Sequence, residues 1–330
     1  MRTTGLTADG LIHTLVPNMN QQPKIGVLCN STLGTPSLHA LLSNKLVAAV
    51  GMPDRVHDAT NDIKNIAATF QQEVAVFTKS KLSTQLIDWV KKNGLDVVLV
   101  FTFPWKIAAD VLTIPPLGFI NFHFGLLPEY RGADAIFWTI KDRAPYGGIS
   151  VHRMDANFDT GGLIHIEKVP LLPTDTYGMH SAKLANANMP VLQKLLPLIF
   201  SGQLKTTVQE EQKANYYSKP GVQEIGIKWD KMTAAEIVAL VNACNPWNKG
   251  AYTMFNNMPL RITEAATQTG AAGDAICGTI LEINNDGLLI QCKDKEALLA
   301  KVVTIEEGIY TAASFAQYCG IKKGLKFSNL

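Results

Sequence analysis

The sequence is poor in the features that mark several protein classes. Its 330 residues carry a formal net charge of only +2, and 18% are charged, a balance that does not indicate a polyanion partner. No apolar run reaches the roughly 18 residues that a membrane-spanning helix needs, so no membrane partner is expected. Residues 1–22 lack a basic stretch followed by an apolar core, and we expect no secretory signal there. With no repeats or low-complexity tracts, the composition indicates an ordinary globular protein.

Cysteine is scarce, and its spacing matches no known framework. There is no CxxC pair, and no histidine lies at metal-ligand spacing from a cysteine. The five cysteines are Cys29, Cys244, Cys277, Cys292 and Cys319. We therefore expect reduced thiols in a cytoplasmic protein, and no metal site.

Apolar residues are abundant, at 47% of a chain long enough for two domains. Residues 1–22 are interpreted as an N-terminal extension and residues 23–207 as the first domain. Residues 208–225 turn polar and end near Pro220-Gly221, which is typical of a linker. Residues 226–330 then form a second, smaller domain.

The first domain alternates short apolar runs with helical segments. The expected strands are residues 25–29, 46–50, 74–77, 95–101, 118–123 and 147–154, and the expected helices include residues 82–93, closed by Gly94, and residues 177–200, kinked by Pro190 and Pro197. Because the first four strands are apolar throughout, they predict a mostly parallel sheet covered on both faces. The expected fold is a doubly wound, Rossmann-like α/β domain, which binds ligands beyond the carboxyl ends of its strands.

The second domain has the pattern of a small, OB-like β-barrel. A helix is expected over residues 233–243, with Thr233 as its N-cap and Glu236 in the capping box. After it, short strands such as residues 278–283 and 288–292 are separated by turns.

Asn121 and His123 are the first candidates for chemistry. They lie two residues apart on an expected strand, so their side chains point to the same side of the sheet. Asp159 follows the next strand, in the run Asp159-Thr-Gly. An amide, an imidazole and a carboxylate together can stabilise an oxyanion and move a proton.

Two motifs in this region carry a family resemblance. The pattern NxHxxLLPxxRG spans Asn121–Gly132, and MDxxxDTG spans Met154–Gly161. Together they resemble the 10-formyltetrahydrofolate-dependent formyltransferase family. The resemblance continues beyond them, because NPWxxGAY at Asn245–Tyr252 and the run Phe315–Phe327 are similar to the barrel-like C-terminal domain of methionyl-tRNA formyltransferases.

The resemblance implies a transferase that takes the formyl group from 10-formyltetrahydrofolate, without a metal. Asn121 and a protonated His123 would donate hydrogen bonds to the developing oxyanion, while Asp159 would hold the imidazole and relay the amine's proton. The folate would contact the loop after the fourth strand and the loop before the catalytic carboxylate; the residues we assign to these contacts are Phe103, Trp105, Lys106, Ile107, Asp155 and Phe158. Trp105 could instead belong to the core, and Asp155 could only shape its loop. His152 could either pack or line the site.

Three further residues are expected to act on the acceptor side or to position the loop: Gly125, Leu127 and Arg131. Many family members have Ser-Leu-Leu-Pro where this chain has Gly125-Leu-Leu-Pro, so a hydroxyl near the site is missing. Arg131 could be a solvated charge, but its place before Gly132 and a helix favours a role in tying down the Leu-Leu-Pro loop.

The acceptor is left open between three possibilities. Formylation of a small amine, such as an amino sugar or an amino-acid-derived metabolite, requires only a pocket. Methionyl-tRNA would require basic surfaces, but residues 51–72 hold one Arg and one Lys against three Asp, and residues 226–330 hold ten Lys and Arg against ten Asp and Glu. Charge therefore favours the small amine. Hydrolysis to formate is the third possibility, because the run from Arg131 to Thr139 resembles the hydrolase domain of 10-formyltetrahydrofolate dehydrogenase.

Overall fold

The structure is a computed structural model that describes residues 22–55, 59–268 and 274–329. The expected extension, residues 1–22, lies outside this part except for its last residue. Packing divides the described chain into two compact units. The first unit contains the residues up to Arg131 together with Gly148–Val169 and Ala182–Tyr216. The second contains Gly132–Gly147, Pro170–Ser181 and the residues from Tyr217 onward, so neither unit is one continuous segment.

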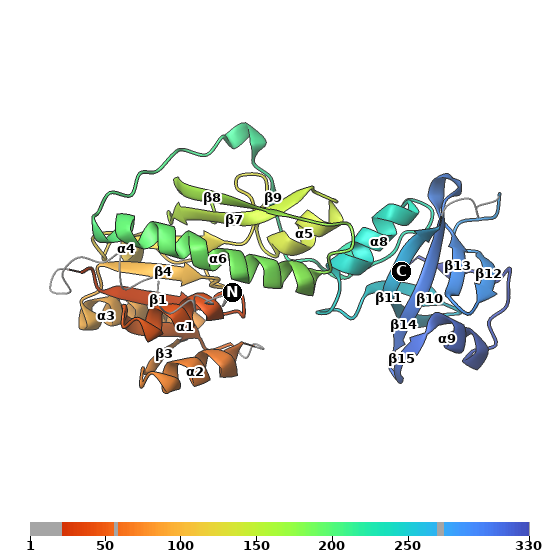
Figure 1. The fold of residues 1–330 in the computed structure, drawn as a ribbon, viewed down its shortest axis with the longest axis horizontal. Helices are drawn as coiled ribbons and strands as arrows, with labels where there is room; N and C mark the ends of the chain where they lie inside the picture. The colour runs from red at the N-terminus through yellow and green to blue at the C-terminus, as the bar shows by residue number, and fades with distance from the viewer. Residues whose placement is uncertain (1–21, 56–58, 269–273, 330) are drawn as a thin grey trace, which may run out of the picture. The chain divides into compact units, whose positions relative to one another are not determined.

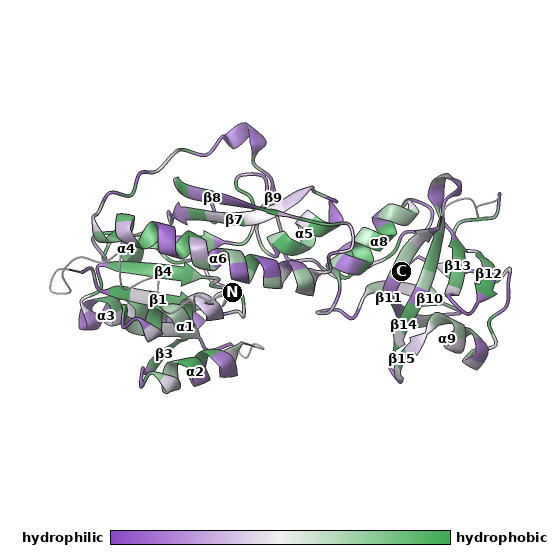
Figure 2. Cartoon of the chain, viewed as in Figure 1, coloured by the Kyte–Doolittle hydropathy of each residue, from purple (hydrophilic) through white to green (hydrophobic). Residues whose placement is uncertain are grey.

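A seven-stranded sheet of order β3-β2-β1-β4-β5-β7-β8 organises the first unit (Figure 1). The strands are β1 (Ile25–Cys29), β2 (Val47–Pro53), β3 (Val74–Phe77), β4 (Val97–Phe101), β5 (Phe119–His123), β7 (Tyr146–Arg153) and β8 (Leu163–Pro170). The pairs from β3 through β5 are parallel, whereas β7 pairs antiparallel with β5. Figure 2 shows β4 as hydrophobic along its length, as expected for a strand covered on both faces. The mostly parallel α/β fold is confirmed.

Helices cover both faces of this sheet. They are α1 (Thr35–Ser43), α2 (Thr60–Thr69), α3 (Leu82–Asn93), α4 (Ala109–Leu112) and α6 (Tyr177–Phe200). Trp89 of α3 packs in a core cluster with Leu28 and Val100. On the opposite face, Gly34, the N-cap of α1, lies against Cys29 and Phe101. Since successive strand residues point to opposite faces, α3 and α1 cover different sides.

The expected bounds hold closely where the sequence carries a stop signal. Helix α3 covers Leu82–Asn93 and ends at Gly94, whose φ of 58° is in the left-handed region that glycine adopts readily. Helix α6 has the expected bounds, with Pro190 and Pro197 inside it; the kink remains a prediction. No helix in the described ranges is both long and apolar enough to cross a membrane.

The second unit is built on an antiparallel sheet of order β12-β13-β14-β11-β10-β16, with β15 paired to β14. Its strands are β10 (Ala251–Phe255), β11 (Met258–Gln268), β12 (Ile280–Asn284), β13 (Gly287–Gln291), β14 (Ala297–Ile305), β15 (Gly308–Thr311) and β16 (Phe327–Ser328). A bridge between Thr279 and Lys326 joins the starts of the first and last strands, so the sheet curls into a half-barrel. The barrel-like prediction is confirmed.

Short helices complete the second unit: α5 (Ala135–Lys141), α7 (Val222–Ile225), α8 (Ala234–Ala243) and α9 (Ala312–Tyr318). The Thr233 N-cap is confirmed, because its hydroxyl accepts from the Glu236 N–H while the Glu236 carboxylate accepts from the Thr233 N–H. The remaining elements are the two-residue strands β6 (Arg131–Gly132) and β9 (Tyr216–Tyr217) and the 3₁₀ turns η3 (Lys79–Lys81), η4 (Glu211–Lys213) and η5 (Lys293–Lys295).

Candidate active site

Asn121 and His123 share one side of β5, as their spacing predicts. The strand buries Phe119, Ile120 and Phe122, while Asn121 and His123 remain partly accessible. The antiparallel register places His152 of β7 opposite Asn121. The end of β5 therefore gathers an amide and two imidazoles before the loop that carries the carboxylate is added.

Asp159 completes a four-residue cluster. Its Oδ1 lies 3.6 Å from His123 Nδ1 and 3.5 Å from His152 Nε2. The Asn121 Nδ2 lies 3.1 Å from the same His152 Nε2. The His123 and Asp159 side chains are only 10% and 11% exposed, so their interaction is shielded from bulk water. The structure thus brings together all three residues that the sequence assigned to catalysis and adds His152, whose role the sequence left open.

The hydrogen bonds assign tautomers to the two imidazoles. His123 Nε2 lies 2.7 Å from the Tyr130 carbonyl, which only accepts, so Nε2 carries a proton. The Asn121 amide N–H only donates, so His152 Nε2 accepts, and its Nδ1 donates to the Arg153 carbonyl at 3.2 Å. Asn121 keeps a second amide N–H for a ligand.

The loop that carries Asp159 is shaped by its own residues. Asp159 has a φ of 57°, a left-handed conformation that non-glycine residues adopt at a cost. Asp155 accepts hydrogen bonds from the Asn157 N–H at 3.0 Å and the Thr160 hydroxyl at 2.6 Å. Asp155 is thus occupied in shaping the loop, one of the two roles considered for it. Gly161 is required because a Cβ there would collide with the Arg153 carbonyl.

The side chains of Gln209 and Arg131 support the Asp159 loop through a chain of hydrogen bonds. The Gln209 amide donates to the carbonyls of Asp159 and Gly161, both at 2.8 Å. Arg131 in turn donates to the Gln209 Oε1 at 3.0–3.1 Å and makes a bidentate pair with Glu211 at 2.8 Å. Arg131 is only 4% exposed, so it is not a solvated charge. Sequence reasoning missed Gln209 and Glu211 because they lie in the polar stretch interpreted as a linker.

The Leu-Leu-Pro loop is positioned through its backbone. The buried Ser150 hydroxyl donates to the Gly125 carbonyl at 2.8 Å and accepts from the Leu127 N–H at 2.9 Å. Gly125 and Leu127 are both buried. The Asn215 N–H donates to the Pro128 carbonyl, and the Arg131 N–H donates to the Asn215 carbonyl. These contacts tie Arg131 and the loop to the segment that contains Gln209.

The residues assigned to folate contact divide into two groups. Ile107 is 2% exposed and packs in the core, so its side chain is not available to a ligand. Phe103 and Trp105 are half-buried against the same core, with their rings 5.7 Å apart. Lys106 and Phe158 are exposed, and Phe158 stands next to Asp159 with 42% of its surface accessible. An exposed aromatic ring beside a shielded carboxylate suits a planar ligand.

The cluster can perform acyl-transfer chemistry. It offers a neutral amide donor, an imidazole N–H and a carboxylate within one shielded space, and these groups can bind an oxyanion and accept a proton. Burial raises the pKa of the nearby Tyr216, and the charge of Asp159 raises it further. The described residues contain no group of three or more His, Cys, Asp or Glu side chains placed to hold a metal.

Comparison with known families agrees with the two-part organisation. Residues 31–196 match the formyl transferase family model, and residues 222–319 match the model of the formyl transferase C-terminal domain. The chain therefore belongs to the formyl transferase family and is an enzyme of that family.

The proteins that this chain resembles differ in their acceptors. The chain is 31% identical over 263 residues to a methionyl-tRNA formyltransferase of Dictyoglomus turgidum, covering 76% of this chain and 83% of the relative. It is 29% identical over 275 residues to one of Legionella pneumophila, with 82% and 87% covered.

The solved structures that it resembles include WlaRD, a sugar 3N-formyl transferase determined with dTDP and 5-N-formyl-THF (TM-score 0.65, 17% identity, 84% and 97% covered). Another is an N-formyltransferase from Helicobacter canadensis in complex with folinic acid and dTDP-3-aminofucose (TM-score 0.64, 17% identity, 87% and 100% covered). At this identity the structural likeness shows the fold alone.

Proposed function

We propose that this enzyme moves the formyl group of 10-formyltetrahydrofolate to the primary amine of a small molecule. The observation that supports the chemistry best is the Asn121, His123, His152 and Asp159 cluster, in which Asp159 Oδ1 lies about equally far from two imidazole nitrogens. Within the formyl transferase family this cluster accounts for both demands of the reaction, charge stabilisation and proton transfer. The free cysteines fit a reducing cytoplasm, where we expect the enzyme to act.

The reaction begins when a neutral amine attacks the formyl carbon. Negative charge then gathers on the formyl oxygen, and the second Asn121 amide N–H can donate to it. His123 Nε2–H can donate as well once it leaves the Tyr130 carbonyl, to which it is bonded at 2.7 Å. One preorganised donor of this kind typically contributes about 3–4 kcal/mol.

Asp159 serves as the proton acceptor in this scheme. The attacking nitrogen becomes an ammonium and must lose a proton before the intermediate collapses. Asp159 takes that proton, directly or through water, and the N10 atom of the departing tetrahydrofolate receives one. The net reaction exchanges the formyl group for a proton, so no oxidant or reductant is needed.

The choice of a small acceptor rests on charge. In the segment that follows β2, residues 54–72, the described charged residues are Asp54, Arg55, Asp62 and Lys64, and all four are exposed. Residues 226–330 hold equal numbers of acidic and basic residues. A tRNA ligand is bound mainly through its phosphates, so these balanced surfaces favour a small amine.

Methionyl-tRNA is the second candidate, and the relatives of similar sequence favour it. Relatives that align with most of both proteins at 29–31% identity are methionyl-tRNA formyltransferases. This acceptor would need a basic surface other than the two segments considered above.

One experiment separates the acceptors. The enzyme is incubated with 10-formyltetrahydrofolate alone, with a panel of amino sugars and amino acid amines, and with methionyl-tRNA. We expect formyl transfer only with a member of the small-amine panel. Formyl-methionine on tRNA would replace that acceptor with the second candidate, and rapid formate release without any acceptor would establish hydrolysis. An Asp159→Asn variant serves as the control for non-enzymatic transfer.

A further inference from the structure

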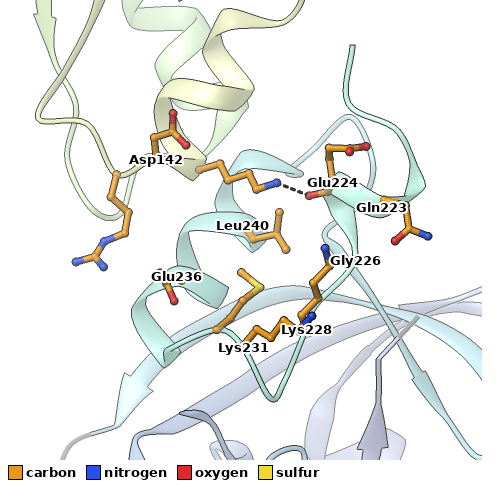
Figure 3. A pocket seen from close by; sticks show the side chains of 11 residues that line it. Asp142, Gln223, Glu224, Gly226, Lys228, Lys231, Glu236 and Leu240 are labelled. Carbon is orange, nitrogen blue, oxygen red and sulfur yellow. Dashed lines mark hydrogen bonds between the residues drawn. The ribbon is translucent and has the colours of Figure 1, made fainter. Parts of the chain in front are cut away.

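A pocket lies entirely within the second compact unit and contains none of the candidate catalytic residues (Figure 3). Its volume is about 600 Å³, which is within the range of small-molecule sites. The end of α5, helix α7, the turn that follows it and helix α8 form the walls. The chemically important lining residues are Lys141, Arg143, Lys228, Lys231, Met232 and Leu240.

Two lysines are held close together in this pocket by a tight turn. The N–H groups of Lys231 and Met232 both donate to the Lys228 carbonyl, at 3.0 and 2.9 Å. Residues three apart in such a turn present their side chains on one face, and Figure 3 shows Lys228 and Lys231 together at one side of the pocket. Within the described chain, neither lysine makes an ion pair or a side-chain hydrogen bond. These two like charges repel each other, although Asp230 lies within the electrostatic reach of Lys231, and an anion between the two lysines would offset the repulsion.

Lys141 is a third cation in the lining, and its side chain is half-buried. Its Nζ donates to the Glu224 carbonyl at 2.9 Å, drawn as a dashed line in Figure 3, and lies 4.9 Å from the Trp138 ring centre. Burial lowers the pKa of Lys141, and the charge of Lys228 lowers it further, although Glu224 and Asp142 oppose the shift. Lys141 and Lys228 therefore repel each other. A bound anion would relieve this repulsion.

The three carboxylates of the lining are bonded to the chain itself. Asp142 accepts from the Tyr217 hydroxyl at 3.0 Å, and Glu224 accepts from the Gly221 N–H at 2.9 Å. Glu236 accepts from the Thr233 N–H and hydroxyl in the N-cap of α8. In Figure 3 Asp142 and Glu224 stand at the opposite side of the pocket from the lysine pair. Asp142 and Glu224 thus lie away from the lysine pair, and the Glu236 carboxylate is engaged in the N-cap of α8.

Taken together, these contacts define a ligand class. The half-buried Met232 supplies an apolar wall, and Gln223 supplies an amide. We propose that this pocket binds a small phosphorylated molecule, with its phosphate between Lys228 and Lys231 and its less polar part against Met232. The proposal does not depend on the identity of the formyl acceptor.

Pyrophosphate is the probe that tests the site. Its binding to the full chain is measured by calorimetry at low ionic strength, for the wild type and for a Lys228→Ala/Lys231→Ala double variant. We expect saturable binding of one pyrophosphate and at least a tenfold weaker affinity in the double variant. The matched control is Lys322→Ala/Lys323→Ala, which removes two exposed lysines of the same unit that do not line the pocket. It should bind within twofold of the wild type.

Two further arms separate the alternatives. An Asp159→Asn variant should bind pyrophosphate as the wild type does, because the candidate active site is not involved; loss of binding there would overturn the proposal. Equal binding by the two double variants, or no saturable binding to the wild type, would also overturn it. If unfractionated tRNA bound and lost affinity in Lys228→Ala/Lys231→Ala while pyrophosphate did not bind, the lysines would be an RNA contact instead of a small-ligand site.

Discussion

At the scale of single residues, the candidate site depends on groups held in costly states. The Asp159 backbone has a left-handed conformation, the His123 side chain is shielded from water, and one Asn121 amide hydrogen is donated to His152. Such costs persist only where the surrounding structure enforces them. The hydrogen bonds from Gln209 to the Asp159 and Gly161 carbonyls hold the Asp159 loop in this conformation.

Thr102 carries a similar cost at the start of the proposed folate loop. Its φ is 60°, although it is β-branched, and its buried hydroxyl has no hydrogen-bond partner among the described residues. Thr102→Gly should raise the free energy of unfolding by about 1 kcal/mol, because relief of the strain exceeds the added entropy of glycine. Urea unfolding measures this, with Thr102→Ser as the control that keeps the hydroxyl. A Thr102→Gly protein less stable than Thr102→Ser would refute the strain.

At the scale of elements, the pairing of β5 with β7 decides which side chains meet. The antiparallel register sets His152 against Asn121 and Ser150 against His123. His152 then lines the cluster, while Ser150 supports the Leu-Leu-Pro loop through the Gly125 carbonyl and the Leu127 N–H. One strand therefore serves both the chemical groups and the loop beside them.

Gln209 should be a positioning residue for Asp159. Gln209→Ala removes the hydrogen bonds to the Asp159 and Gly161 carbonyls and the acceptor for Arg131, so the protein should lose roughly 1–3 kcal/mol of stability. Gln209→Glu keeps an acceptor for Arg131 but loses both donors. It should therefore be more stable than Gln209→Ala, while its kcat stays as low as that of Gln209→Ala, because neither variant holds the Asp159 loop. Urea unfolding and steady-state formyl transfer measure the two effects. Wild-type kcat in Gln209→Glu would show that the Asp159 loop needs no such support.

The Arg131–Glu211 pair predicts an acid-dependent component of stability. Hydrogen bonding to Arg131 lowers the pKa of Glu211 below its usual 4.5 in the folded protein. A carboxyl group with a lowered folded pKa stabilises the protein above its unfolded pKa, and this contribution is lost as the pH falls through the folded value. Glu211→Gln should therefore flatten the decline in stability below about pH 4.5. Thermal melts from pH 3 to 7 test this, and an unchanged decline would exclude the pair as its source.

At the scale of the whole molecule, the sequence predicted what local rules determine. Apolar runs predicted β1 and β4, Gly94 predicted the end of α3, and the spacing of Asn121 and His123 predicted their shared side. It did not predict Gln209 and Glu211, because a polar stretch between domains carries no periodic signal even when its side chains are bound. The pocket of the second unit was missed for a related reason: its lysines come from α5 and from the turn before α8, and only the fold brings them together.

Thiol reactivity should report the packing of both units. Cys29, Cys244 and Cys292 are buried, and desolvation raises the pKa of each thiol to about 12. Cys277 and Cys319 are partly accessible. At pH 8 a thiol reagent such as dithionitrobenzoate should modify the two accessible cysteines first and the buried three only on unfolding. Five thiols reacting at one rapid rate would contradict this packing.

The most direct test of the central claim is the single-turnover rate of formyl transfer, measured for the wild type, His123→Ala and Asp159→Asn with the acceptor that the panel identifies. Each variant should fold normally, as judged by its circular dichroism and urea unfolding, yet transfer at least roughly 100-fold more slowly, because each has lost an oxyanion donor or a proton acceptor. Near-wild-type transfer by both variants would contradict the assignment of this cluster as the site of formyl transfer.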